Sequence, residues 1–217
     1  MAKRGIDISY WQGNVDMAKV SAAGIDFVGV KLTDGVGSQN SYAHTQSVAA
    51  KDAGLLVFFY HFGHPENKSH SATDEANFFI SLIRSNSIPT ADIIPALDIE
   101  QAYTNNGATE VKIPSSVSLE DWVTEFAGVM AQNDFPSIML YSNPTYLNEY
   151  LKSGHSLGSM PLWLSEYASK ITLKAAGFPD VPAIWQYSGS GTIDGVSGKV
   201  DLNTCDDLTP LMLSKSA

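Results

Sequence analysis

The sequence predicts an α/β fold in which eight strands close into a TIM-like barrel with an irregular second half that is poor in helices. Short apolar segments with the two-residue period of strands alternate with segments of helical period. Such alternation is typical of a parallel sheet flanked by helices. The count of strand-like segments is that of a closed barrel. After residue 160, glycine and proline leave little room for helices between the strands.

The expected elements follow one another regularly over the first 150 residues. The expected strands are 5–9, 27–33, 55–62, 93–100, 137–143, 162–167, 183–187 and 199–202. The expected helices are 15–23, 43–53, 71–85, 119–132 and 144–151. Gly24, Gly54 and Gly154 follow three of these helices, where C-caps favour glycine. Between 167 and 183, and between 187 and 200, we expect loops or hairpins in place of helices.

Length and composition favour one domain. The 217 residues are 44% hydrophobic, and neither a repeat nor a low-complexity linker divides them. We expect a barrel over residues 1–210 and a short tail over 211–217. The single cysteine, Cys205, excludes an intramolecular disulfide and fits folding in a reducing compartment.

Charge and hydropathy exclude several classes of function. The net charge is −10 and no basic patch stands out, which argues against nucleic acid as a partner. No run of apolar residues is long enough to span a membrane, so we expect no membrane insertion. The first residues lack the apolar stretch of a secretory signal, and we expect synthesis without one.

Side-chain alternation gathers four acids at one end of the barrel. Successive strand residues point to opposite faces, and the apolar set should pack against the helices. The residues between them must then face the barrel axis, where barrel enzymes keep their chemistry. Lys31 is the expected counter-ion. The acids of this set are Asp7, Asp98, Glu100 and Asp201.

Crowded carboxyl groups at one mouth point to glycoside chemistry. Like charges raise the pKa of at least one acid and keep it protonated near neutral pH. A protonated acid beside ionised ones is the arrangement that glycoside hydrolysis uses. Asp98 and Glu100 are about 7 Å apart along a strand, within reach of one sugar linkage. This spacing leaves the choice between retention and inversion open.

Aromatic side chains near the expected strand ends suit a sugar ligand. Sugar rings have apolar faces that stack on aromatic rings, and tyrosine hydroxyls can bond ring substituents. These aromatic residues are Tyr10, Trp11, Tyr60, Phe62, Tyr141, Trp163, Tyr167, Trp185 and Tyr187.

An ordered set of short motifs resembles glycoside hydrolase family 25, the Chalaropsis-type lysozymes. The motifs cover nearly the whole chain and occur in the order of the family. They are Asp7-Ile-Ser-Tyr-Trp-Gln-Gly13, Lys31-Leu-Thr-Asp-Gly35, Tyr60-His-Phe62, Ala96-Leu-Asp-Ile-Glu100, Leu162-Trp-Leu-Ser-Glu-Tyr167, Trp185-Gln-Tyr187 and Val200-Asp-Leu-Asn203.

The resemblance implies a (β/α)5(β)3 barrel that cleaves the β-1,4 bond from N-acetylmuramic acid to N-acetylglucosamine in bacterial peptidoglycan. It implies Glu100 as general acid/base. Asp98 would be the nucleophile or stabiliser, or would orient the N-acetyl group of the substrate. Asp7 and Asp201 would be flanking acids that tune Glu100. The family often has Thr-Glu-Gly where this chain has a shorter acid, Asp34.

The resemblance also implies a biological setting. Members without a signal peptide are commonly phage endolysins, made in the bacterial cytoplasm and released onto the cell wall by a separate protein. Many carry a wall-binding module, which would here be absent or removed. We expect a monomer without cofactor or metal. The expected substrate-binding residues are Tyr10, Trp11, Lys31, Tyr60, His61, Phe62, Tyr141, Trp163, Tyr167, Trp185 and Gln186.

Three alternatives remain. A metal hydrolase could use His61, His64 and His70, but no His-x-His or His-Glu-x-x-His motif is present. A peptidoglycan- or chitin-binding barrel without catalysis would need the aromatic platform but no competent acid. A Ser-His-Asp hydrolase would need a Gly-x-Ser-x-Gly elbow, which the sequence lacks.

Overall fold

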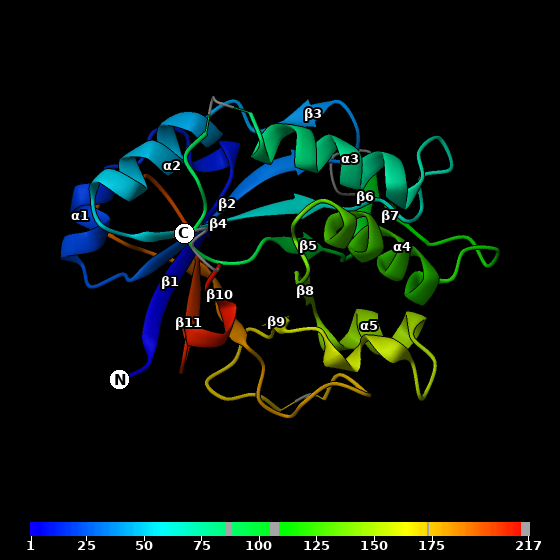
Figure 1. Ribbon diagram of the computed structural model, residues 1–217. Helices are drawn as coiled ribbons and strands as arrows, with labels where there is room; N and C mark the ends of the chain where they lie inside the picture. The colour runs from blue at the N-terminus through cyan, green and yellow to red at the C-terminus, as the bar shows by residue number, and fades with distance from the viewer. Residues whose placement is uncertain (86–87, 105–108, 173, 214–217) are drawn as a thin grey trace.

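The computed structural model describes residues 1–85, 88–104, 109–172 and 174–213. It contains a closed barrel of eight strands with helices outside it (Figure 1). The sheet runs in the order β1-β11-β10-β9-β8-β5-β4-β2, and β1 pairs with β2 to close the ring. The barrel strands are β1 (Lys3–Ile8), β2 (Phe27–Asp34), β4 (Leu56–Phe62), β5 (Ala96–Asp98), β8 (Met139–Ser142), β9 (Leu162–Ser165), β10 (Ile184–Gly191) and β11 (Val200–Cys205). The predicted α/β barrel is confirmed.

The helices follow the first five barrel strands, as predicted. Side chains of Asp16, Ser71, Ser118 and Asn143 cap four of them by accepting a hydrogen bond from a backbone N–H. Within the described residues, no α-helix follows β9, and the helix-poor second half is confirmed. None of the described helices is long and apolar enough to cross a membrane. The α-helices are α1 (Met17–Ala22), α2 (Ala43–Asp52), α3 (Ala72–Ile83), α4 (Leu119–Gln132) and α5 (Pro144–Tyr150).

The last strand runs against the rest of the barrel. The strand β11 pairs antiparallel with both of its neighbours, β1 and β10, whereas β10 pairs parallel with β9. Because β11 is reversed, its first residues lie at the end of the barrel where the parallel strands finish. Asp201, the second residue of β11, is therefore directly opposite Asp7 in the register of β1.

Alternation along the strands separates two cores. Between the barrel and the helices, the outer core holds Ile6, Ile8, Val28, Val30, Leu97 and Ile99. Inside the barrel, the inner core holds Phe27, Phe58, Met139, Trp163 and Ile184. The expectation that the apolar alternate residues face the helices is confirmed.

Two glycines make room for the rings of the inner core. A Cβ atom on Gly5 would lie 2.3 Å from the ring of Phe27, and one on Gly29 would lie 2.5 Å from the ring of Phe58. Real Cβ atoms essentially never approach so closely. The large rings of the inner core therefore require glycine at the paired positions of the neighbouring strands.

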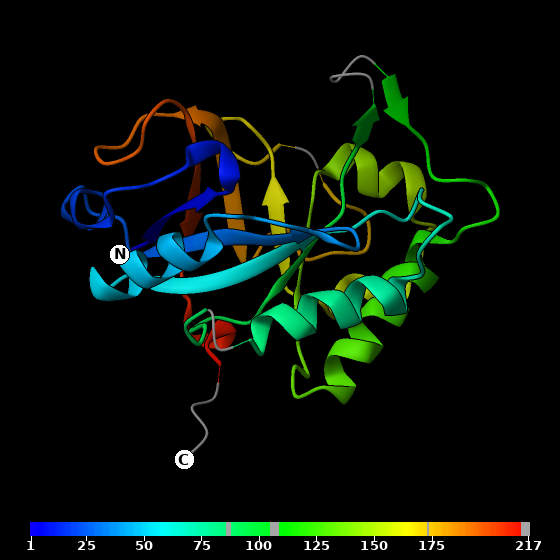
Figure 2. The same cartoon turned by 90° about the horizontal axis from the view of Figure 1, so that it is seen from above.

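Three features lie outside the predicted elements. A hairpin of β6 (Ala102–Thr104) and β7 (Thr109–Val111) follows β5 and projects beyond the barrel (Figure 2). A two-residue strand, β3 (Ser38–Gln39), pairs with β2. The described residues also include three short 3₁₀ helices, which are η1 (Tyr10–Gln12), η2 (Ser156–Ser159) and η3 (Thr209–Leu211).

Candidate active site

The structure brings the four predicted acids to one mouth of the barrel. Asp7 and Asp201 are register partners on β1 and β11, while Asp98 ends β5 and Glu100 follows two residues later. Asp7 and Asp98 are buried, with 3% and 5% of their surface exposed. Glu100 and Asp201 are partly exposed. Two acids therefore lie deep in the mouth, and two are open to an incoming ligand.

Burial raises the pKa of every one of these acids, and repulsion from another acid adds to it at Asp7, Asp98 and Glu100. Burial has the largest effect on Asp98, and the charge of Glu100 adds to it. Burial also raises the pKa of Asp7, with a further contribution from Asp201. Burial and Asp201 raise the pKa of Glu100 to about 7, although the charge of Lys31 opposes this shift. The mouth therefore holds protons near neutral pH, which a general acid requires.

A hydrogen-bond network orients the deepest acid. Asp7 Oδ2 accepts hydrogen bonds from Gln186 Nε2 at 2.9 Å and from Asn203 Nδ2 at 2.7 Å. The side-chain amide oxygen of Gln186, Oε1, in turn accepts hydrogen bonds from the hydroxyls of Tyr141 at 2.9 Å and Tyr167 at 3.2 Å. Gln186 thus connects the acid to two tyrosines that the sequence predicted as substrate-binding residues.

Aromatic rings form the floor below the acids. Trp163 is 1% exposed, and its ring lies edge-on to Tyr60 at 5.6 Å and to Tyr141 at 4.5 Å. Its Nε1–H donates to Asn203 Oδ1 at 2.8 Å. Trp163 therefore supports the site from beneath, because buried aromatic rings fix the residues packed on them.

Exposed aromatic rings stand at the rim. Tyr10 and Trp11 follow β1 in η1, are 47% and 77% exposed, and have ring centres 4.4 Å apart. Tyr167, which is 63% exposed, lies two residues beyond the end of β9. These rings are accessible platforms for the apolar faces of sugars.

A β-bulge places a further charged pair at the mouth. The register of β2 against β4 shifts between Lys31 and Thr33, so Thr33 pairs with His61 and Asp34 pairs with Phe62. Lys31 and Asp34 consequently reach the same side, and their Nζ and Oδ2 atoms are 2.5 Å apart. The side chain of Lys31 also lies over the ring of Phe62, 4.4 Å from its centre.

Two predicted substrate-binding residues lie away from the mouth. His61 is fully buried outside the barrel, where its ring stacks on Phe126 of α4 and its Nε2 bonds Glu75 of α3 at 2.8 Å. Trp185 pairs with Leu164, which belongs to the outer core, and its Nε1–H donates to the carbonyl of Glu166 at 2.9 Å. Both occupy strand positions that alternate with inward-facing residues, and we leave both out of the proposed site.

The histidines of the segment His61-Phe62-Gly63-His64 diverge. His61 points toward α3, whereas Nε2 of His64 is 2.7 Å from Asp34 Oδ1 at the rim. Among the residues that the structure describes, no three His, Cys, Asp or Glu side chains form a group that could hold a metal ion.

One buried oxygen of the site is left without a hydrogen-bond partner. Asp98 Oδ1 is buried and has no hydrogen-bond partner among the described residues. An orphaned buried carboxylate oxygen costs free energy in the folded protein. Its position in the mouth suits an acid that acts on a ligand.

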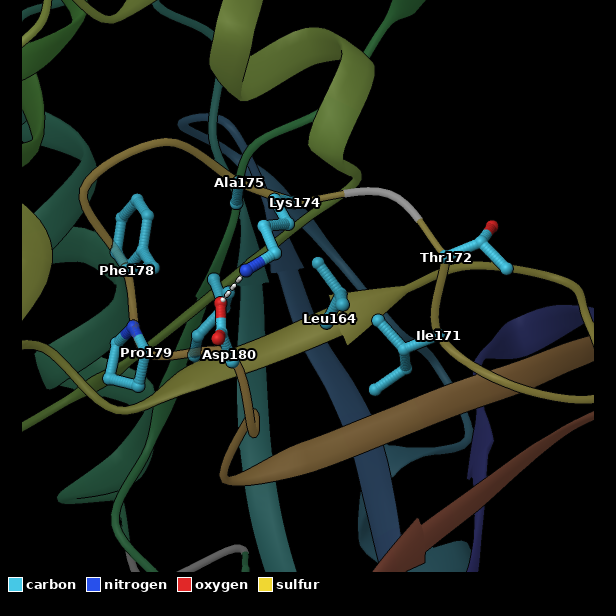
Figure 3. Close-up of a pocket in the computed structure, with 9 residues that line it drawn as sticks. Leu164, Ile171, Thr172, Lys174, Ala175, Phe178, Pro179 and Asp180 are labelled. Atoms are coloured by element: carbon cyan, nitrogen blue, oxygen red, sulfur yellow. Dashed lines mark hydrogen bonds and ion pairs between the residues drawn. The ribbon is translucent and has the colours of Figure 1, made fainter.

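A separate pocket lies on the outside of the barrel, between β9 and the segment leading to β10 (Figure 3). Leu164, Ile171 and Phe178 line it, and Lys174 Nζ bonds Asp180 Oδ1 at 2.8 Å beside it. Leu164 belongs to the outer core, so this pocket opens away from the acids.

Sequence reasoning missed Asn203 and Asp34 as parts of the site. Asn203 follows Asp201 by two residues and therefore shares its face, a signal that alternation alone provides. Asp34 is three residues from Lys31, and only the bulge brings the two to one side. A bulge adds one residue to a strand and so breaks the two-residue alternation, and the sequence pattern does not show where this happens.

Comparison with known proteins places the chain in a family. The family described as glycosyl hydrolases family 25 matches residues 6–196. Lysozyme M1 of Streptomyces globisporus is 28% identical over 201 residues, which cover 92% of this chain and 66% of that protein. The autolytic lysozyme of Clostridium acetobutylicum is 30% identical over 203 residues, which cover 92% of this chain and 55% of that protein. The chain thus spans less than two thirds of the length of these relatives.

The fold agrees with the same family. The crystal structure of a bacterial lysozyme from Streptomyces coelicolor superposes with a TM-score of 0.81 and 26% sequence identity, over 97% of this chain and 94% of that one. Because the family match extends over most of the barrel and includes three of the four acids, the chain belongs to glycosyl hydrolases family 25.

Proposed function

We propose that this protein is a lysozyme that hydrolyses the β-1,4 bond between N-acetylmuramic acid and N-acetylglucosamine in bacterial peptidoglycan. The observation that carries the proposal is the pair Asp98 and Glu100, two residues apart on one face at the barrel mouth, with the pKa of Glu100 raised to about 7. Its family membership and its lysozyme relatives give the substrate class.

Glu100 is the proposed general acid/base. It is the more exposed member of the pair, so it can reach the glycosidic oxygen, and its raised pKa keeps a proton available for the leaving group. After the leaving group departs, the ionised Glu100 takes a proton from the attacking water.

Asp98 is the proposed partner of Glu100. Its unpaired Oδ1 is available either to stabilise the positive charge that develops on the sugar or to orient the N-acetyl group of the substrate. Asp7 and Asp201 are the proposed flanking acids. Asp201 acts by raising the pKa of Glu100, and Asp7 by fixing the Gln186 and Asn203 side chains.

The substrate-binding surface is proposed to consist of the residues that line the mouth. Sugar rings would stack on the exposed rim rings, and the tyrosine hydroxyls and the Lys31 ammonium would face their polar substituents. The residues of this surface are Tyr10, Trp11, Lys31, Tyr60, Phe62, Tyr141, Tyr167 and Gln186, with Trp163 as their support.

The test is the analysis of digested peptidoglycan by mass spectrometry. New reducing ends of N-acetylmuramic acid are expected, and Glu100→Gln should release none. Reducing ends of N-acetylglucosamine or free amines would refute the proposed bond. Binding to cell walls without clearing of a wall suspension would favour the non-catalytic sugar-binding barrel.

We also propose that the chain acts on the cell wall as a monomer without inserting into membranes, after synthesis in a bacterial cytoplasm. A mass from light scattering equal to one 23.4 kDa chain would support the monomer. A larger mass, or partition into vesicles, would contradict this part of the proposal.

A further inference from the structure

A second charged cluster lies at the rim of the mouth, where the end of β2 meets the loop after β4. A carboxylate at its centre is held from both sides. Asp34 Oδ1 is 2.7 Å from His64 Nε2, and Asp34 Oδ2 is 2.5 Å from Lys31 Nζ. The members of this rim cluster are Lys31, Asp34, His64 and Glu66.

His64 is fixed at three points. Besides Asp34, its Nδ1 is 2.6 Å from Glu66 Oε1, and its backbone N–H donates to Glu75 Oε2 at 3.1 Å. The Glu75 side chain is fully buried, so this end of the loop is anchored to α3. With a carboxylate at each ring nitrogen, His64 donates from both and carries a positive charge.

Lys31 is the member of the rim cluster that also acts on the acids, because its charge lowers the pKa of Asp98 and of Glu100. Its Nζ is 4.4 Å from the centre of the Phe62 ring, and Phe62 is the register partner of Asp98. Asp98 and Glu100 attract this ammonium group when they are ionised, because opposite charges interact over several ångströms in a partly buried site. The ion pair with Asp34 pulls it toward the rim instead.

We propose that His64 is a positioning residue that, by fixing Asp34, holds Lys31 on the Phe62 ring and limits how closely it approaches the carboxyl groups of Asp98 and Glu100. Without the bond from His64, Asp34 is free to turn. Lys31 can then move closer to Glu100, whose ionised form its charge favours.

The consequence for catalysis rests on the proposed function. A lysine that approached Glu100 would stabilise its ionised form and remove the proton that the leaving group needs. The restraint on Lys31 therefore keeps Glu100 a competent acid near neutral pH. Asp34 and His64 would act on the reaction without touching the substrate.

His64 and Asp34 keep their charges near neutral pH, because the pKa of each is shifted away from that range. Burial opposes the protonation of His64, but the hydrogen bonds with Asp34 and Glu66 raise its pKa to about 10. Burial raises the pKa of Asp34, but the His64 hydrogen bond and the charge of Lys31 lower it to about 2. The ionisable groups that face the mouth from the surrounding elements are Asp7, Lys31, Asp34, Tyr60, Asp98, Glu100, Tyr141, Tyr167 and Asp201.

The test measures the pKa of Glu100 directly. Its side-chain carboxyl carbon is titrated by ¹³C NMR in the free protein, with Glu100→Gln to assign the signal. We expect His64→Ala to lower this pKa by roughly half a unit or more. His64→Gln, which keeps a hydrogen-bond donor toward Asp34 without the charge, should change it by less than about 0.2 unit.

A double-mutant cycle identifies Lys31 as the group that moves. Lys31→Met alone should raise the pKa of Glu100, and His64→Ala should have no effect in the Lys31→Met background. The alkaline limb of kcat/KM should shift with the titration in each variant. If His64→Ala does not fold, His64→Asn, which is too short to reach Asp34, takes its place.

Two results would overturn the inference. A rise of the pKa of Glu100 in His64→Ala would mean that His64 acts only through its own charge, and an unchanged pKa would mean a purely structural role. The titration does not depend on catalysis, so it remains readable if the wild-type protein fails to hydrolyse peptidoglycan. That failure would refute the proposed function alone.

Discussion

Replacing Glu100 by glutamine is expected to abolish hydrolysis and, at the same time, to stabilise the folded protein at neutral pH. The two effects have one cause. Glutamine cannot donate the proton that the leaving group needs, which removes the general acid. It also cannot ionise, so it avoids the repulsion and desolvation that burial and Asp201 impose on the carboxylate.

The pKa of Glu100 sets the size of the stabilisation. It is raised from the ordinary value 4.5 to about 7, so between these values the folded state binds more protons than the unfolded state. Stability is then fully present below pH 4.5 and is lost as the pH rises through 7. Linkage gives a cost of about 3 kcal/mol at pH 7 as an upper value, which solvent at a partly exposed side chain reduces to about 1–2 kcal/mol. At pH 4.5 it falls below about 0.5 kcal/mol.

Urea unfolding at pH 4.5 and pH 7, followed by circular dichroism, measures this difference. Glu149→Gln is the matched control, since its exposed carboxylate bonds Lys112 at 3.0 Å and its loss should change stability by less than about 1 kcal/mol. A Glu100→Gln variant no more stable than wild type at pH 7, or equally stabilised at both pH values, would refute the electrostatic account.

Four further predictions test other parts of the site and the fold. On soluble glycan strands, kcat/KM should fall as the pH rises above about 7, the pKa of Glu100. A value of kcat/KM that stays constant up to pH 9 would contradict Glu100 as the acid. Asn203→Ala removes hydrogen bonds to Asp7 and Trp163, and should lower kcat and destabilise the protein by about 1–3 kcal/mol in urea unfolding. His61→Phe removes the side-chain partner of buried Glu75, which keeps the bond from the His64 backbone N–H, and should cost about 3–5 kcal/mol of stability with an unchanged KM; a raised KM would return His61 to the binding site. Gly29→Ala forces a Cβ against Phe58 and should lower stability by about 1–3 kcal/mol, and a melting temperature equal to that of wild type would contradict the packing argument.

Alternation accounts for the part of the site that the sequence could predict. Apolar residues flank Asp7 in β1 and Asp98 at the end of β5, and Glu100 is two residues beyond Asp98, so the face of all three acids follows from the two-residue period alone. The barrel then brings these strands together at one end. The two-residue alternation can be recognised from neighbouring residues alone, without knowledge of contacts between distant segments. The acids could therefore be predicted from the sequence.

The placement of His61 and Trp185 shows the limit of a motif. Both belong to motifs that contain residues of the mouth, and both lie on the outer face of their strands. His61 has polar partners there, Glu75 and Thr33, which come from distant segments. A motif predicts which part of the fold a residue belongs to, but the strand register determines to which face of the sheet its side chain points.

The antiparallel direction of β11 is the reason that Asp201 lies opposite Asp7. The parallel strands deliver their mouth residues at their carboxyl ends, whereas Asp201 is near the start of β11. If β11 ran parallel to β1, its first residues would lie at the opposite end of the barrel. Leu208 and Leu211, which follow β11, belong to the apolar inner core. The reversal of the last strand therefore places the fourth acid at the mouth. Since Asp201 also raises the pKa of Glu100, the irregular second half of the barrel helps determine the acidity of the group proposed to start the reaction.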